Sequence, residues 1–152
     1  MSDIVTNRKA FHDYHIIERF EAGIELKGTE VKSIRAGFAN LTNAFARIEK
    51  AQIFLFGADI QPYERASHEQ HDPKRNRRLL LHKKEINKLF GLTSIKGHTL
   101  VALRMYWKNG RVKIELGVGK GKEDRDKRSD LKKRVEQREV DREMSRFNRK
   151  RG

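Results

Sequence analysis

Cysteine is absent from this chain of 152 residues. The absence excludes disulfides, thiolate zinc sites and a thiol nucleophile, and it fits a protein of the reducing cytoplasm. Long hydrophobic runs are also missing, since no apolar stretch approaches the roughly 18 residues that a membrane-spanning helix requires. The N-terminus, MSDIVTNRKAFHDYH, has neither the apolar region nor the small-residue cleavage site of a signal peptide. We therefore expect a cytoplasmic protein with no membrane partner.

Recognisable catalytic and metal-binding patterns are missing as well. His68 and His71 are one residue too close for the zinc-protease spacing, and they lie in a loop before Pro73. The glycines of residues 117–121 fit neither the Rossmann nor the Walker spacing, so we expect them to let the chain turn or approach RNA closely. No nucleophile–base arrangement can be inferred. We expect no enzyme, no metal site and no cofactor.

Positive charge is abundant. The chain has 35 Lys and Arg against 21 Asp and Glu, a net charge of +14 with a pI of about 10.2. This excess implies a polyanionic partner, either a nucleic acid or an acidic membrane surface. We expect a phosphate-tracking surface to form from two groups of cations, although the first could also be an ordinary solvated loop. They are Lys74, Arg75, Arg77 and Arg78, and the outward-facing Lys32, Arg35, Arg111 and Lys113.

The segment 121–152 differs from the rest because it cannot bury much surface. It holds 13 Lys or Arg and 8 Asp or Glu, a net +5, with strong helix formers and no proline. On a helical wheel Leu131 and Val135 lie on one face, whereas Val140, Met144 and Phe147 lie on nearly the opposite one. A helix docked on its own domain has a single apolar face. We predict a tail that is disordered alone and becomes helical on a partner, although a free-standing solvated helix or a plain basic tail is the alternative.

Alternation of apolar and polar residues predicts a mainly β body with short helices. Asn109-Gly110 predicts a two-residue hairpin, and Gly91 is expected to end the second helix. We divide the chain into a loose segment 1–13, a small barrel or sandwich over 14–120 and the basic tail 121–152. The expected strands are 14–26, 41–48, 53–60, 79–81, 99–107 and 111–118, and the expected helices are 29–36 and 82–91.

Five segments resemble one family. They are KGTEVKSIRAG (27–37), FLFGADI (54–60), DPKRNRRLLLHKKEI (72–86), YWKNGRVKIELGVGKGK (106–122) and DKRSDLKKR (126–134). Their order and spacing resemble those of the SsrA-binding protein family, SmpB. The resemblance implies an OB-like closed β-barrel that binds the tRNA-like domain of transfer-messenger RNA (tmRNA). It further implies delivery to stalled ribosomes, where the tail enters the vacant mRNA channel, and indirect partnership with alanyl-tRNA synthetase and elongation factor Tu through tmRNA.

The resemblance also assigns roles to individual residues. RNA binding carries over to Glu21, Leu80 and Lys113, with the basic Lys32, Arg35, Arg75, Arg77 and Arg78 as support. Contact with the ribosome carries over to His12, Gly121, Asp126, Lys127 and Arg128. Arg125 stands where many members have His, so stacking by that His would be replaced by guanidinium stacking or a phosphate contact. The alternative functions are a structural ribosomal protein with a basic extension and an RNA-processing enzyme.

Overall fold

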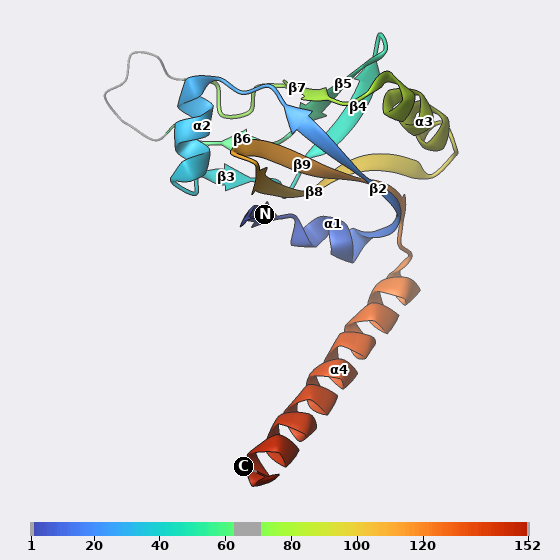
Figure 1. Ribbon diagram of the computed structural model, residues 1–152. Coiled ribbons are helices and arrows are strands. Elements are labelled where there is room, and N and C mark those ends of the chain that lie inside the picture. The colour runs from blue at the N-terminus through green and yellow to red at the C-terminus, as the bar shows by residue number, and fades with distance from the viewer. Residues whose placement is uncertain (1, 63–70, 152) are drawn as a thin grey trace. The chain divides into compact units, whose positions relative to one another are not determined.

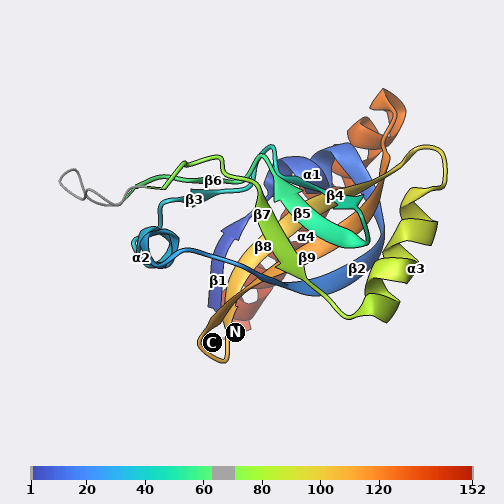
Figure 2. The ribbon, with the colours of Figure 1, turned by 90° about the horizontal axis from the view of Figure 1, so that it is seen from above.

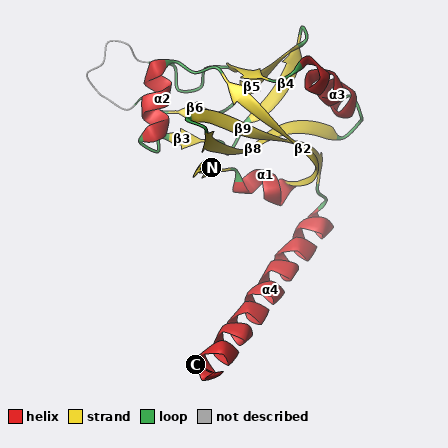
Figure 3. Ribbon diagram, in the orientation of Figure 1, coloured by secondary structure: helices red, strands yellow, loops and turns green. Residues whose placement is uncertain are grey.

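The structure is a computed structural model that describes residues 2–62 and 71–151, with the backbone alone described at 124–126, 130 and 145–151. The chain divides into two compact units, Met1–Gly121 and Lys122–Gly152. The first unit, called the body below, is mainly β with short helices, as the sequence predicts (Figures 1 and 3). Its elements are β1 (Ser2–Thr6), α1 (Arg8–Asp13), β2 (Tyr14–Ile24), α2 (Gly28–Arg35), β3 (Ala39–Asn40), β4 (Phe45–Glu49), β5 (Gln52–Phe56), β6 (Asp59–Ile60), β7 (Arg77–Leu80), α3 (Lys83–Thr93), β8 (His98–Lys108) and β9 (Arg111–Gly121).

Antiparallel pairing joins six strands in a ring. The order β8–β4–β5–β7–β2–β9 returns to β8, because β8 and β9 also pair with each other. The strands that pair over the greatest length are β2 with β9 and β8 with β9. The last of these pairs is the predicted hairpin, in which Asn109 and Gly110 have φ angles of 52° and 73°. Positive φ at both turn positions is what a type I′ turn requires, so this prediction is confirmed.

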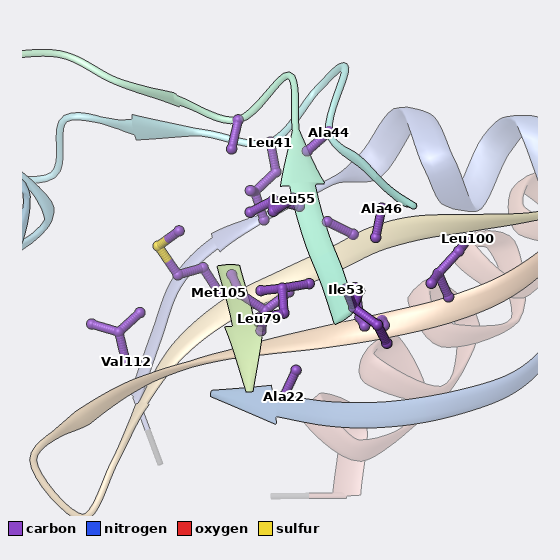
Figure 4. Close-up of a cluster of buried hydrophobic side chains, with 14 of the residues drawn as sticks. Ala22, Leu41, Ala44, Ala46, Ile53, Leu55, Leu79, Leu100, Met105 and Val112 are labelled. Atoms are coloured by element: carbon purple, nitrogen blue, oxygen red, sulfur yellow. The ribbon is translucent and has the colours of Figure 1, made fainter. Parts of the chain in front are cut away.

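The core lies inside the ring of strands. Alternate residues of β9, from Val112 to Val118, point inward and are buried, as their period-2 pattern predicts. Residues of β4, β5, β7 and β8 complete this core, and Figure 4 shows Val112 of β9 in the same cluster as Ile53, Leu55 and Met105. In both ribbon views α2 and α3 lie at opposite ends of the sheet (Figures 1 and 2). Each helix turns one apolar side toward the core, with Ile34 of α2 and Leu89 of α3 buried.

We expected residues 1–13 to be loose, but residues 2–13 form strand β1 and helix α1. Strand β1 pairs with β8, and Asn7 then fixes the start of α1. The Asn7 side chain is buried; its Nδ2 donates to the carbonyl of Ala102 at 2.9 Å, and its Oδ1 accepts from the backbone N–H of Ala10 at 3.1 Å. Ala10 packs with Val101 and Leu103 in a second, smaller cluster on the outer side of β8.

Gly117 and Gly119 of β9 are required by the packing of neighbouring side chains. A Cβ at Gly117 would lie 2.8 Å from Cδ1 of Leu103, and one at Gly119 would lie 3.0 Å from Cβ of Tyr14. Separations this short force a neighbour to move, so the bare backbone at these two positions leaves room for the side chains of Leu103 and Tyr14. The expected turn is therefore wrong at these two positions, because β9 continues through them, whereas a close approach to RNA stays a prediction.

Several element boundaries also differ from the predictions. The single strand expected at 53–60 is divided into β5 and β6, with Gly57 between them at a φ of 74°. The strand expected at 41–48 begins only at Phe45, because Asn40 Oδ1 accepts from the backbone N–H of Thr42 at 2.8 Å and turns the chain there. Helix α3 continues past Gly91 to Thr93, since Gly91 does not adopt the left-handed conformation that ends helices.

The second unit contains one long helix, α4 (Asp124–Arg151). Its apolar side chains Leu131, Val135, Val140 and Met144 are all exposed, which agrees with a helix that has no single buried face. The disorder of this segment in isolation stays a prediction. Among the described residues, no helix combines the length and the apolar character needed to cross a membrane.

Candidate RNA-binding face

The register of three neighbouring strands brings Glu21, Leu80 and Lys113 together. Gly23 of β2 pairs with Leu80 of β7 on one side and with Lys113 of β9 on the other. Glu21 lies two residues before Gly23 and therefore points to the same outer side of the sheet. These residues line an open hollow of about 430 Å³ together with Leu81, His82 and Glu85. We call this surface of β7, β2 and β9 the RNA-binding face.

Leu80 and Lys113 are both available on this face. The Leu80 side chain is 46% exposed, which is unusual for leucine in a strand. A Cβ at Gly23 would lie 3.3 Å from Cβ of Leu80, so the glycine leaves the space that Leu80 occupies. Among the described residues, no carboxylate forms an ion pair with Lys113. Its ammonium thus makes no direct ion pair there, although its charge acts on the nearby Glu21 carboxylate.

Glu21 is held in place by two side chains from β8. The Tyr106 hydroxyl donates to its Oε2 at 2.5 Å, and Lys108 Nζ lies 3.1 Å from the same oxygen. The Tyr106 bond, with the charges of Lys108 and Lys113, lowers the pKa of Glu21 despite its partial burial. Burial and the Glu21 bond raise the pKa of Tyr106, so its hydroxyl keeps its proton and donates. Glu21 is thus a fixed, ionised acceptor at neutral pH.

A chain of ion pairs borders the face. Glu115 of β9 accepts from Arg104 Nη2 at 2.8 Å and from Arg19 Nη1 at 3.1 Å. Arg104 also pairs with Asp3 of β1 at 2.8 Å, and its guanidinium lies 5.0 Å from the centre of the Tyr106 ring. Arg104 therefore covers Tyr106, which explains how an outward-pointing tyrosine is only 2% exposed.

Arg77 does not belong to any exposed cationic surface, so our prediction for it is wrong. Its side chain is fully buried, with Nε 2.5 Å from Glu30 Oε2. Nη1 donates to the carbonyl of Ala58 at 3.0 Å, and Nη2 donates to that of Pro73 at 3.1 Å. A guanidinium surrounded in this way ties β7 to α2 and to the preceding loop, and it cannot reach a phosphate.

Arg75 shares the same buried carboxylate. Its Nη2 lies 2.6 Å from Glu30 Oε1, which also accepts from the backbone N–H of Lys27 at 2.8 Å. Burial alone would raise the pKa of Glu30, but the bonds from Arg75, the Lys27 backbone and Arg77 outweigh it and lower the pKa. Arg75 is therefore largely committed to the fold, although part of its side chain is accessible.

The other predicted cations are exposed. Lys32 and Arg35 lie on the outer side of α2, and the Arg35 guanidinium is 5.6 Å from the centre of the Trp107 ring. Arg78 is on β7, two residues before Leu80, and is 3.6 Å from Glu25 in a partly exposed ion pair. Pairs of this kind are weak in water, which leaves Arg78 free to exchange its partner.

The residues assigned to the ribosome lie apart from this face along the chain. His12 is in the last turn of α1, partly exposed, with Nδ1 2.8 Å from Asp13 Oδ1. Gly121 ends β9, and a Cβ there would meet nothing within 4 Å. Lys127 and Arg128 lie in the first turns of α4. The side chains of Arg125 and Asp126 lie outside the described residues.

The loop histidine that suggested a metal has a structural role. His71 is buried, with Nδ1 3.0 Å from the Thr29 hydroxyl and Nε2 2.6 Å from the carbonyl of Ile60. Both ring nitrogens are thereby engaged in bonds that tie the loop to α2 and β6. His68 lies outside the described residues.

Sequence reasoning missed Tyr106 and the buried role of Glu30. The signal for Tyr106 is the hairpin register, since Tyr106 pairs with Lys113 and so lies beside the predicted site residues. For Arg77 the signal is its phase in β7, because Arg77 and Leu79 are two residues apart and both are buried.

A closed ring of antiparallel strands with a basic surface is typical of the class of small β-proteins that bind nucleic acids. Comparison with known families makes the class specific. The family model described as "SmpB protein" matches residues 4–146 of this chain. The chain belongs to the SmpB family.

Individual relatives agree with this assignment. The SsrA-binding protein of Geobacillus sp. (strain WCH70) is 56% identical over 139 residues, which cover 91% of this chain and 90% of the relative. That of Bacillus subtilis (strain 168) is 54% identical over 136 residues, 90% of this chain and 87% of the relative. A chain in the solved structure described as "tmRNA-SmpB: a journey to the center of the bacterial ribosome" matches with a TM-score of 0.68. It is 49% identical, and the match covers 79% of this chain and 85% of that one.

Proposed function

We propose that this protein is the RNA-binding adaptor of trans-translation, which binds the tRNA-like domain of tmRNA and delivers it to stalled ribosomes. The observation that carries the proposal is the convergence of Glu21, Leu80 and Lys113 on one exposed face of three strands. The family membership and the strong similarity to SsrA-binding proteins support it. The role is binding and delivery rather than catalysis, and its place is the cytoplasm.

We infer that the ring of strands is an OB-like closed barrel that presents this face to folded RNA. The three residues have complementary chemistry. Lys113 supplies a cation that makes no direct ion pair among the described residues and can meet a phosphate, and Leu80 supplies an apolar contact for a sugar or base. A carboxylate near RNA is useful only as an acceptor, from a 2′-hydroxyl or a base amino group. Tyr106 and Lys108 hold Glu21 ready for that task.

The exposed cations Lys32, Arg35 and Arg78 extend the positive surface beyond the face itself. Contacts of this kind position a protein on RNA without reading its sequence. Arg75 supports RNA binding indirectly, because its ion pair with Glu30 holds α2 in place. Arg77 stabilises the fold and does not contact the RNA.

The tail and its surroundings serve the ribosome. We infer that His12, Gly121, Arg125, Asp126, Lys127 and Arg128 face the decoding centre and the mRNA channel. A helix of the length of α4 spans roughly 40 Å at about 1.5 Å per residue. Its charge on all sides suits an empty channel lined by RNA phosphates. Alanyl-tRNA synthetase and elongation factor Tu are partners only through the tmRNA; a structural ribosomal protein is not favoured by the relatives.

The test measures the affinity of the full chain for the tRNA-like domain by fluorescence anisotropy. Lys113→Ala is compared with Lys84→Ala, which removes an exposed cation from α3. We expect Lys113→Ala to weaken binding about tenfold and to reduce the slope of log K against log salt by about 1. The Lys84 variant should behave as the wild type. Equal binding by both variants would show that the RNA lies elsewhere.

Glu21 is tested with two substitutions, because its removal also affects the fold. Glu21→Ala leaves the buried Tyr106 hydroxyl without its acceptor, which costs about 1–3 kcal/mol. Glu21→Gln retains an oxygen for the tyrosine and loses the charge. We expect it to fold normally and to bind the RNA several-fold more weakly, and unchanged binding would exclude the carboxylate from the contact.

A further inference from the structure

An aromatic surface lies on the outside of β4 and β5, beyond the residues that the proposed function uses. Phe45 and Arg47 of β4 point away from the core, because Ala46 between them is buried in it. Phe54 and Phe56 of β5 point to the same outer side and are the pairing partners of Arg47 and Phe45. Within the described residues, neither apolar cluster includes any of these three phenylalanines. We call this set of four residues the Arg47 platform.

The guanidinium of Arg47 is held on the rings beneath it. Its Cζ lies 5.1 Å from the centre of the Phe45 ring and 5.5 Å from that of Phe56. These two rings are stacked, with centres 5.5 Å apart and planes inclined by 14°. Among the described residues, no carboxylate pairs with Arg47, whereas Arg19, Arg78 and Arg104 each have an acidic partner. Arg47 is therefore a positioned cation whose charge the protein does not neutralise.

Two features beside the platform are suited to a nucleic acid. Arg47 also borders an open pocket of about 330 Å³, lined by Phe90, Thr93, Ser94 and His98 among others. Phe90 is 62% exposed, an unusual position for so large an apolar side chain. Stacking surfaces with nearby cations are what unpaired bases bind, since every base has a flat face and an adjoining phosphate.

The platform is continuous with the RNA-binding face. Phe54 of β5 pairs with Arg78 of β7, and Leu80 lies two residues further along the same side of β7. A strand of RNA that leaves the first surface past Arg78 arrives at Phe54 and Arg47 next.

We propose that the Arg47 platform binds an unpaired stretch of the same RNA whose folded part occupies the RNA-binding face, with one base stacked on the Arg47 guanidinium. This inference rests on the proposed function only in taking the folded part of the RNA to bind the RNA-binding face. The base stacks on a planar cation already fixed by two rings, so little side-chain freedom is lost on binding. Its phosphate lies within the positive surroundings of Arg47 and Arg78.

The experiment uses the full chain and two RNAs, the folded tRNA-like domain with and without a short unpaired adenosine extension that carries 2-aminopurine. With the wild type we expect the extension to tighten binding about tenfold and to quench the 2-aminopurine, because stacking is worth that much per base. Arg47→Ala should abolish both effects and leave the affinity for the unextended RNA unchanged. Arg47→Lys, which keeps the charge without the planar group, should lose the quenching. Lys84→Ala should retain both effects.

The outcomes separate this proposal from the first one. If the gain and the quenching survive in Arg47→Ala, or if Lys84→Ala loses them equally, the platform is not a base-stacking site. If the wild type fails to bind the unextended RNA, the proposed function fails. The isolated adenosine oligonucleotide then tests the platform alone, with quenching by the wild type and none by Arg47→Ala as the supporting result. Equal quenching by the two proteins, or none by either, overturns it.

Discussion

Replacing Arg77 by alanine should destabilise the folded protein and leave the charge on its surface almost unchanged. The substitution removes a guanidinium that is fully buried between Glu30 and the carbonyls of Ala58 and Pro73. Breaking a buried ion pair from one side costs about 3–5 kcal/mol, since the remaining charge loses its partner. Arg75 still pairs with the other Glu30 oxygen, so we expect the lower part of that range, about 3 kcal/mol.

A loss of this size is large beside the total stability of a small domain, about 5–15 kcal/mol. For a chain of this length it corresponds to a fall in Tm of roughly 10 °C. The assay is urea and thermal unfolding followed by the fluorescence of Trp107, the single tryptophan, which packs against the core of the body. It therefore reports on the body and not on the helical tail.

The neighbouring Arg78→Ala variant is the matched control. Arg78 is exposed and only weakly paired, so its removal should change stability by less than about 1 kcal/mol and should weaken RNA binding instead. The reasoning is refuted if Arg77→Ala is as stable as Arg78→Ala and loses RNA affinity, because Arg77 would then act as an exposed cation.

Three further predictions follow from the packing, the buried carboxylate and the net charge. Gly117→Ala should lower the free energy of unfolding by about 1–3 kcal/mol, because its Cβ would lie 2.8 Å from Leu103 Cδ1. Gly121→Ala is the control and should keep the stability of the wild type, because a Cβ at Gly121 meets nothing within 4 Å. Equal losses of stability by the two variants in urea unfolding would contradict the packing described. Glu30 has a pKa lowered from 4.5 by folding, so its stabilisation is present above that pH and is lost as the pH falls through the lowered value. Glu30→Gln should therefore lower the free energy of unfolding at pH 7 and make it depend less on pH in the acidic range. The same acid dependence in the variant and the wild type would contradict this role of Glu30. Affinity of the wild type for the tRNA-like domain should fall with salt at a slope of roughly −3 to −4, as expected for about four phosphate contacts; a flat response would remove the electrostatic argument.

Local signals in the sequence were sufficient for strand β9 and for the hairpin of the body. The alternation from Val112 to Val118 and the Asn109-Gly110 turn both depend on residues close together in the chain, and both are confirmed. The region around Asn7 could not be predicted in this way. Its partner in the structure is the carbonyl of Ala102, 95 residues away, and nothing in the short polar N-terminus indicates that distant strand.

Charge in the sequence does not reveal which cations reach the surface. Arg77 and Arg78 are adjacent and chemically identical, yet one is buried and the other exposed, because successive residues of β7 point to opposite sides. Only the structure shows that Glu30 is there to receive Arg77. Arg47 was overlooked for a related reason, since its ring contacts depend on the pairing of β4 with β5.

We propose a division of labour in which the body binds tmRNA and the basic tail acts on the ribosome. The tail has no apolar face suited to a domain core, since Leu131, Val135, Val140 and Met144 are all exposed. Ordering it on arrival costs about 1–2 kcal/mol per residue for the backbone, so an occupied mRNA channel should exclude it.

The most direct measurement compares the full chain with a truncation after Lys122, for tmRNA binding and for tagging of a peptide on a stalled ribosome. The account predicts that the truncated protein binds the tRNA-like domain within about twofold of the full chain, since the exposed tail charges contribute little to a site on the body. It also predicts that tagging is abolished. Equal loss of binding and tagging would place the tail within the RNA site and contradict the division of labour.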